Sequence, residues 1–146
     1  MEPEKIKLIH IPEVKSTNLH ASALLSGNVY QTPFLIYTNF QLKGKGQGEN
    51  TWHSEQGKNL LCSIAVEPLK LKIEDNFYLS KLTTLALFSM LNKLLSGLNI
   101  KWPNDILVDD KKIGGILIEN TLQGAFVNSS IIGIGLNVNQ TKFPRF

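Results

Sequence analysis

Two lysines flank a short run of turn-forming and polar residues in the second half of the chain. The run reads Lys101-Trp102-Pro103-Asn104-Asp105, and Lys112 follows it, two residues before Gly114. Pro103 would fix the backbone where one strand turns toward the next, so that both lysines could face one pocket. There they would offset the repulsion between a carboxylate and a phosphate that must react with each other. An ordinary polar hairpin with solvated lysines explains the same spacing and stays open as an alternative.

A glycine-rich polar segment offers a second place for phosphate chemistry. It reads Gln41-Leu42-Lys43-Gly44-Lys45-Gly46-Gln47-Gly48-Glu49-Asn50-Thr51-Trp52, and its glycines alternate with polar residues. Glycine lets backbone N–H groups come close to a ligand, and Lys45 would add positive charge to such a loop. The spacing matches neither the Walker phosphate loop nor the dinucleotide-binding loop. A flexible surface loop is the alternative that the glycines alone do not exclude.

Two further segments carry polar residues at places where a ligand could bind. The run Gly133-Ile134-Gly135-Leu136-Asn137-Val138-Asn139 has glycines inside a predicted strand, which indicate a bulge or a close backbone approach. Asn137 could then both donate to and accept from an adenine edge. The run Ser16-Thr17-Asn18 begins a predicted helix. A plain core strand is the alternative for the first segment, and a helix N-cap is the alternative for the second.

The elements that must hold these segments are mostly short strands. Helices are predicted from Ser16 or Thr17 to about Leu25 and from Asn76 to Ser96, where Gly97 would end the second helix. One face of the second helix would consist of Leu79, Leu82, Ala86, Leu91 and Leu94. Strands are predicted over residues 6–11, 33–38, 59–67, 100–102, 106–108, 113–119 and 131–138. Strands outnumber helices and come in hairpins, which predicts an α+β fold with a mixed, largely antiparallel sheet and flanking helices.

The composition is that of a globular domain and argues against several classes of protein. The 146 residues fit one domain, and 42% hydrophobic residues suffice for a core. The net charge of +3 comes without a Lys/Arg cluster, so nucleic acid is not predicted as a partner. No stretch predicts a membrane span or a signal peptide. Cys62 predicts a buried thiol in a reducing compartment, and the histidine spacing predicts no metal site.

Taken together, these segments resemble the biotin protein ligase family from Ser16 to Asn139. The most specific part is Lys101-Trp102-Pro103-Asn104-Asp105 with Lys112-Ile113-Gly114-Gly115-Ile116-Leu117-Ile118-Glu119, and the other segments follow in the family's order. The resemblance implies a fold like that of class II aminoacyl-tRNA synthetases and lipoate ligases. It also implies a cytoplasmic enzyme that uses ATP and Mg²⁺ to convert biotin to biotinyl-5′-AMP. The biotinyl group would pass to a lysine of a biotin carboxyl carrier protein, without a tightly bound cofactor, and a homodimer is left open.

The resemblance assigns roles to residues of this chain. Lys112 and Lys45 would be catalytic, with Lys112 at the reacting carboxylate and the α-phosphate. Biotin would be bound by Ser16, Thr17, Asn18, Gln41, Gly44, Gly46, Lys112, Gly114 and Gly115. The nucleotide would be bound by Lys45, Gln47, Trp52, Lys101, Asn104, Asp105 and Asn137. The loop from Gly44 to Thr51 would close over the adenylate.

The chain departs from the family in the glycine loop. The family's loop usually reads Gly-Arg-Gly-Arg, and here it reads Gly44-Lys45-Gly46-Gln47, which keeps one charge and loses the arginine fork. The resemblance further implies one catalytic domain over residues 1–146 that is incomplete at its C-terminus. It would lack the helix-turn-helix and the C-terminal barrel that relatives carry. Two alternatives remain: a lipoate- or octanoate-transferring ligase, and a module that binds biotin or its adenylate without full turnover.

Overall fold

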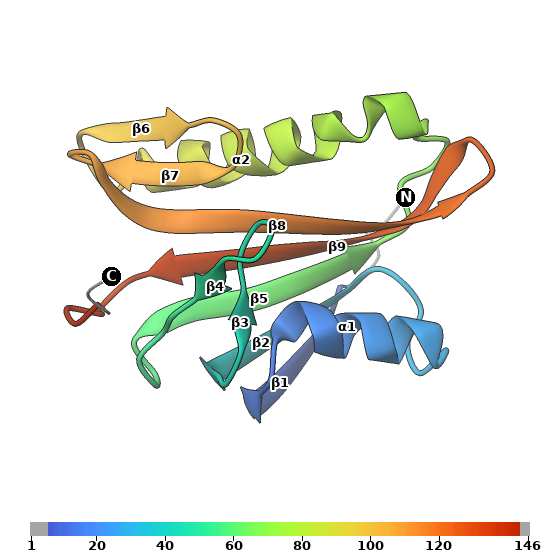
Figure 1. The fold of residues 1–146 in the computed structure, drawn as a ribbon, viewed down its shortest axis with the longest axis horizontal. Coiled ribbons are helices and arrows are strands. Elements are labelled where there is room, and N and C mark those ends of the chain that lie inside the picture. The colour runs from blue at the N-terminus through green and yellow to red at the C-terminus, as the bar shows by residue number, and fades with distance from the viewer. Residues whose placement is uncertain (1–5, 144–146) are drawn as a thin grey trace.

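The computed structural model describes residues 6–143, which form a seven-stranded sheet, a small separate hairpin and helices on both faces (Figure 1). The strands of the large sheet are β1 (Lys7–Val14), β2 (Phe34–Gln41), β5 (Asn59–Val66), β6 (Leu98–Lys101), β7 (Asp105–Val108), β8 (Lys111–Gln123) and β9 (Phe126–Asn137). The hairpin consists of β3 (Gly44–Lys45) and β4 (Thr51–Trp52). The helices are α1 (Thr17–Ser26), α2 (Phe77–Leu91) and the short 3-10 helix η1 (Ile73–Asp75).

The large sheet has the strand order β1-β2-β5-β9-β8-β7-β6. Its β1–β2 pair is parallel, and every other pair in it is antiparallel. The strands from β6 to β9 follow one another as hairpins, which needs only short connections. The predicted α+β class with a mixed, largely antiparallel sheet is therefore confirmed.

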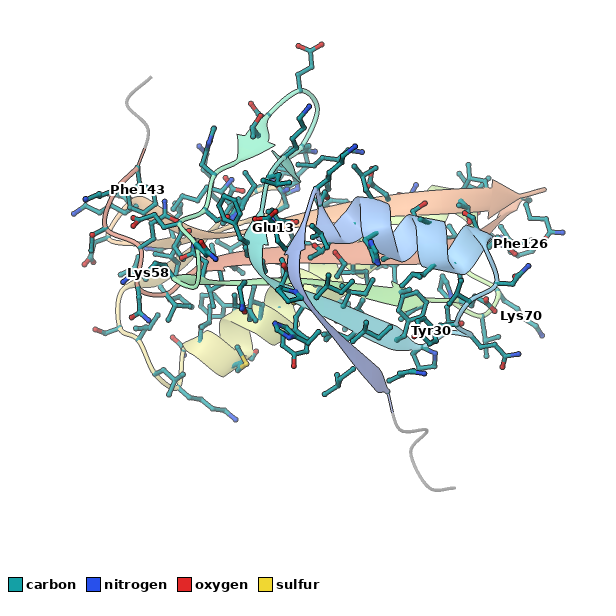
Figure 2. All side chains as sticks on the ribbon, turned by 90° about the horizontal axis from the view of Figure 1, so that it is seen from below. Glu13, Tyr30, Lys58, Lys70, Phe126 and Phe143 are labelled. Atoms are coloured by element: carbon teal, nitrogen blue, oxygen red, sulfur yellow. The ribbon has the colours of Figure 1, made fainter. Side chains whose placement is uncertain are left out.

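Each face of the sheet is covered by one helix. Figure 2 shows α1 in front of the sheet, where it packs on β2, β5 and β9. The buried residues of this layer are Ala21, Phe34, Ile36, Ala65 and Ile131. The other helix, α2, packs on β6, β7 and β8, and the buried residues there are Leu87, Leu91, Leu98, Ile106, Ile116, Ile132 and Leu136. Successive strand residues point to opposite faces, so neighbours such as Ile131 and Ile132 belong to different layers.

The second helix differs from the sequence prediction in length and orientation. It ends at Leu91 rather than at Ser96, because the next residues turn back and the backbone N–H of Leu94 donates to the carbonyl of Leu91 at 2.8 Å. The predicted apolar face is wrong at Leu82 and Leu94, which are 68% and 77% exposed, and correct at Leu91, which is buried. The buried stripe consists of Thr84, Leu87 and Leu91. Apolar residues surround this helix, so leucine spacing alone does not show which side is buried.

The first two strands are longer than predicted, and this extension positions the site. They continue to Val14 and Gln41, past the predicted ends at Ile11 and Thr38. Pro12 is tolerated because β1 is an edge strand, where a missing N–H breaks no ladder. The two strands run parallel, with Val14 paired to Gln41, so both end at the same edge of the sheet. That register brings the start of α1 close to Gln41.

The β7–β8 connection is a tight polar turn at Asp109 and Asp110. Asp109 and Asp110 both have positive φ, at 47° and 62°, and this backbone matches the right-handed twist of the flanking strands. The tight turn places Lys112 one residue into β8, beside the end of β7. Within residues 6–143, the structure contains no helix of the length and hydrophobicity that a membrane crossing requires.

Candidate active site

A cavity of about 670 Å³ lies between the start of α1, the β3–β4 hairpin and the β6–β7 turn, with parts of β8 and β9 beneath it. The predicted site residues that line it are Ser16, Thr17, Asn18, Gln41, Lys45, Gly46, Gln47, Trp52, Lys101, Asn104, Asp105, Lys112 and Gly115. The structure thus brings both hairpin lysines and the glycine segment to one cavity, although they are far apart in the sequence.

One end of the cavity is built from hydroxyl and amide groups. Gln41 Oε1 accepts hydrogen bonds from the backbone N–H of Thr17 at 2.8 Å and from its Oγ1 at 3.1 Å. The hydroxyl of Ser63 lies 2.7 Å from Thr17 Oγ1. Ser16, Thr17 and Ser63 are buried. Such a set suits a neutral ligand group that both donates and accepts hydrogen bonds.

Asn18 is held by three partners at the floor of this polar end. Its Nδ2 donates to the carbonyl of Leu117 at 3.3 Å and to Glu119 Oε2 at 2.8 Å, while its Oδ1 accepts from Ser63 at 2.6 Å. A side chain at Gly133 would collide with Asn18 Oδ1. Both amide hydrogens of Asn18 are therefore used within the fold, and Gly133 leaves the space that this carboxamide occupies.

The indole ring of Trp52 lies against two glycines that are partners across the β8–β9 ladder. Gly115 pairs with Gly135, and a Cβ on Gly135 would come within 2.5 Å of Trp52 Cε2. A Cβ on Gly115 would come within 3.0 Å of Trp52 Cζ3. These glycines give the ring a flat surface without side chains. Among the described residues, Trp52 Nε1 is a buried donor without a hydrogen-bond partner.

Lys112 is held beside this ring by an acidic partner. Its Nζ lies 2.7 Å from Asp105 Oδ1 and 5.6 Å from the centroid of the Trp52 ring. Asp105 pairs with Lys101 across the β6–β7 ladder, so the turn gathers two lysines and a carboxylate. The Asp105 side chain is only 19% exposed, whereas that of Lys112 is 46% exposed. The lysine therefore combines a fixed position with access to a ligand in the cavity.

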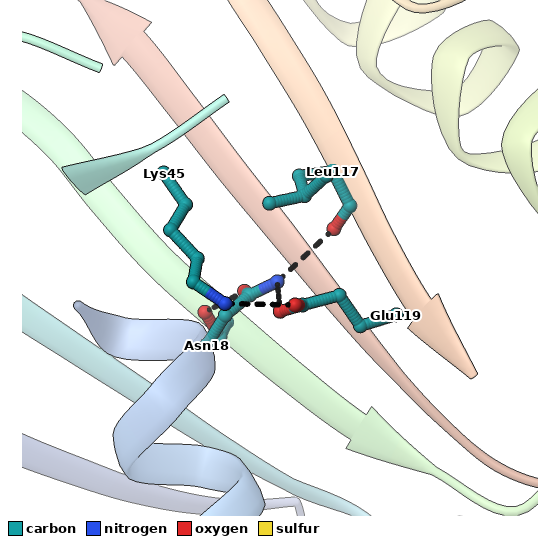
Figure 3. A network of polar contacts seen from close by, with 5 residues as sticks. Asn18, Lys45, Leu117 and Glu119 are labelled. Atoms are coloured by element: carbon teal, nitrogen blue, oxygen red, sulfur yellow. Dashed lines mark hydrogen bonds and ion pairs between the residues drawn. The ribbon is translucent and has the colours of Figure 1, made fainter. Parts of the chain in front are cut away.

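Lys45 of the glycine segment also has an acidic partner. Its Nζ lies 3.1 Å from Glu119 Oε1 (Figure 3). Glu119 is on β8, the same strand that begins with Lys111 and Lys112. The ion pair ties the β3–β4 hairpin to β8. Within the hairpin, Gly44 pairs with Trp52, and a Cβ on Gly44 would be 2.5 Å from the Trp52 carbonyl oxygen.

Three predicted site residues do not line the cavity. Gly114 faces the α2 layer, where a Cβ on it would meet Leu136 and Ile106. Gly44 lies in the β3–β4 hairpin, in contact with Trp52. Asn137 lies on β9, two residues beyond Gly135 on the same face. Its Oδ1 is buried and finds no hydrogen-bond partner within residues 6–143. The predicted contacts of these residues with biotin or adenine stay predictions.

Sequence reasoning gave no role to two residues that organise the site. Ser63 lies in the apolar strand β5, and nothing in its neighbourhood marks it out. Glu119 is the last residue of the motif that begins at Lys112. Strand alternation could have predicted the face of the sheet to which its side chain points. Counting in steps of two from Gly115 leads through Leu117 to Glu119 on one face.

Neither a reactive thiol nor a cluster of metal ligands accompanies this cavity in the part of the chain that the structure describes. Cys62 lines the cavity, but burial raises the pKa of its thiol to about 11. It is therefore a neutral thiol near pH 7, because burial disfavours the thiolate.

Comparison with known proteins agrees with this geometry. Residues 11–137 match the model of the biotin/lipoate A/B protein ligase family. The chain belongs to this family. A "Bifunctional ligase/repressor BirA" of Bacillus spizizenii is 34% identical over 135 residues, which are 91% of this chain and 41% of that protein. The chain therefore spans about two fifths of that ligase/repressor's length.

Solved structures of ligases have the same fold. The biotin protein ligase of Leishmania major in complex with biotinyl-5-AMP superposes with a TM-score of 0.74 at 30% identity, covering 99% of this chain and 60% of that one. The biotin acetyl coenzyme A carboxylase synthetase of Helicobacter pylori, with bound biotinylated ATP, gives a TM-score of 0.74 at 26% identity, covering 96% and 65%. The fold predicted from the family resemblance is therefore confirmed.

Proposed function

We propose that this chain is the catalytic core of a biotin protein ligase, which activates biotin with ATP and transfers it to a protein lysine. The observation that carries the proposal is a single cavity with a neutral polar end at Thr17 and Gln41 and a cationic end at Lys101 and Lys112. Biotin has matching ends, a neutral ureido ring and a carboxylate. The complex of the Leishmania relative with biotinyl-5-AMP supports the same assignment.

In the first step, an oxygen of the biotin carboxylate attacks the α-phosphorus of ATP. A P–O bond forms, the bond to the β-phosphate breaks, and biotinyl-5′-AMP and pyrophosphate result. Lys112 would lie at the carboxylate and the α-phosphate, where its charge stabilises the added negative charge of the transition state. Lys45 and Lys101 would add positive charge at the phosphates. The cavity would thereby place two anions in reacting geometry, which is the larger part of the catalytic task.

In the second step, the amine of an acceptor lysine attacks the acyl carbon of the adenylate. The amide bond forms, the anhydride C–O bond breaks, AMP leaves and the amine releases its proton. Because water also cleaves the mixed anhydride, the β3–β4 hairpin and its connecting loop would protect the adenylate by covering it.

The residue assignments follow the ends of the cavity. Around the ureido ring and chain of biotin we place Ser16, Thr17, Asn18, Gln41, Gly46 and Gly115. Around the nucleotide we place Gln47, Trp52, Asn104, Asp105 and Asn137. The unpartnered Trp52 Nε1 and Asn137 Oδ1 support a polar ligand on this face of β9.

The remaining parts of the proposal concern partners and location. Mg²⁺ would enter with ATP, and the cavity carboxylates that could hold it beside the phosphates are Glu49 and Asp105. The acceptor would be a biotin carboxyl carrier domain of a carboxylase, and the reaction would take place in the cytoplasm. A homodimer stays a prediction of the family resemblance.

The proposal is tested by incubating the chain with ATP, Mg²⁺, an acceptor domain and either biotin or lipoate. We expect the mass of a biotinyl group on the acceptor, and no modification with lipoate, because the polar end offers hydrogen bonds that a dithiolane ring cannot use. Lipoyl transfer would identify the alternative ligase. Binding of biotin and ATP without any acceptor modification would identify a binding module.

A further inference from the structure

We propose that Glu119 is a positioning residue with two tasks: it fixes Asn18 below the polar end of the cavity, and it holds Lys45 until a phosphate takes its place. This inference rests on the proposed function, since it assigns Lys45 to the phosphates of ATP and the adenylate. Glu119 itself does not line the cavity, and it would act only through its two partners.

The two oxygens of the Glu119 carboxylate serve different parts of the fold. Oε2 accepts from Asn18 Nδ2 at 2.8 Å, and Oε1 lies 3.1 Å from Lys45 Nζ. Figure 3 shows Asn18, at the start of α1, and Lys45 both reaching the carboxylate of Glu119. A single side chain therefore links the polar end of the cavity to the loop that would cover the adenylate.

The hydrogen bond between Asn18 and Glu119 should persist when a ligand binds. Asn18 is 3% exposed, and its carboxamide has further partners in the Leu117 carbonyl and the Ser63 hydroxyl. Breaking such a contact would leave a buried amide unpaired, which is costly. The carboxylate of Glu119 is thus held in place from the side of α1.

The ion pair between Lys45 and Glu119 should be replaced when a phosphate binds. The side chains of Lys45 and Glu119 are 43% and 40% exposed, and ion pairs in such surroundings contribute little to stability. Lys45 also lines the cavity, and its long side chain can turn from the carboxylate toward a bound phosphate. Because the carboxylate and the phosphate compete for the same ammonium group, the ligand must displace Glu119 to gain Lys45.

The substitution that isolates this competition is Glu119→Gln. Glutamine keeps a carbonyl oxygen that can accept from Asn18, but it removes the charge that competes for Lys45. We expect a non-hydrolysable acyl-sulfamate analogue of biotinyl-5′-AMP to bind about two- to fivefold more tightly, the range that an exposed ion pair allows. The affinity for biotin alone should change less than the affinity for the analogue, because biotin does not reach the phosphate position and any effect through Asn18 acts on both ligands.

The experiment measures both ligands by calorimetry in a double-mutant cycle of Glu119→Gln with Lys45→Gln. The inference predicts tighter analogue binding only where Lys45 is present. Glu74→Gln is the matched control, because Glu74 pairs with Lys72 outside the cavity and the same charge is lost there. Weaker analogue binding in Glu119→Gln, or a gain that persists without Lys45, would overturn the inference and leave the proposed function standing.

A second measurement needs no variant and so does not depend on how well Glu119→Gln folds. The side-chain ammonium resonance of Lys45 in the wild-type chain should shift with the adenylate analogue and stay in place with biotin. An unchanged resonance in the presence of bound analogue would contradict the inference. A wild-type chain that binds neither biotin nor the analogue would overturn the proposed function, and this inference with it.

Discussion

The substitution Gly135→Ala tests whether the glycine surface under Trp52 serves the ligand. The added Cβ would lie 2.5 Å from Trp52 Cε2 and 2.9 Å from Trp52 Nε1. Carbon atoms in ordinary contact are about 3.5 Å apart, so the ring must move by about 1 Å. A displacement of that size in a reacting site costs on the order of a hundredfold in rate. We therefore expect a large loss of adenylate formation.

The position of the ring can be followed directly by fluorescence. In a Trp102→Phe background Trp52 is the only tryptophan, and Gly135→Ala should shift its emission to longer wavelength as the half-buried ring moves toward solvent. The matched control is Gly114→Ala on the opposite face, whose Cβ would meet Leu136 Cδ1 at 3.3 Å and not the indole. It should leave Trp52 emission unchanged. If Gly135→Ala keeps both the emission and the activity of its background, the glycines do not shape the site.

Three further predictions concern the surroundings of the cavity. Asn18→Ala should lower the free energy of unfolding in urea by about 1–3 kcal/mol, because it removes the buried carboxamide that bonds the Leu117 carbonyl, Glu119 and Ser63; a change below about 0.5 kcal/mol would speak against this. The thiol of Cys62 keeps its proton in the folded chain up to about pH 11 but loses it above 9.0 when unfolded, so the free energy of unfolding should fall by roughly 2–3 kcal/mol between these values. The free energy of unfolding of Cys62→Ala should lack this part of the decline with pH. Identical pH profiles of unfolding for Cys62→Ala and the wild-type chain would refute the prediction. Amides of residues 43–51 should exchange faster in the free chain than with the adenylate analogue bound, and equal exchange by mass spectrometry would count against a closing loop.

Much of the fold follows from local patterns in the sequence. The buried strand at Asn59, the helix that begins at Thr17 and the Asp109-Asp110 turn were predictable, since each is marked by apolar runs or turn-forming residues. The same patterns placed Lys112 at the start of a returning strand. The orientation of α2 was not predictable, because Leu85 and Met90 on its outer side are as apolar as the leucines that it buries.

The candidate site was predictable in its cavity-lining residues and not in what holds them. Lys45 and Glu119 are 74 residues apart, and Asn18 and Glu119 are 101 apart. Such pairs depend on strand order and register across β5, β9 and β8, which no local spacing encodes. The same reason explains why Ser63 was missed, since only the folded sheet brings its hydroxyl to Thr17 and Asn18.

The most direct test of the proposed chemistry is biotin-dependent exchange of labelled pyrophosphate into ATP, measured for Lys112→Ala beside Lys111→Ala. The two lysines are neighbours at the start of β8, and of the two only Lys112 lines the cavity. We expect Lys112→Ala to lose about a hundredfold or more in exchange rate with its thermal unfolding unchanged, and Lys111→Ala to stay within about twofold of the wild-type chain. Wild-type exchange rates in a folded Lys112→Ala chain would contradict the central claim that this lysine joins biotin to the nucleotide.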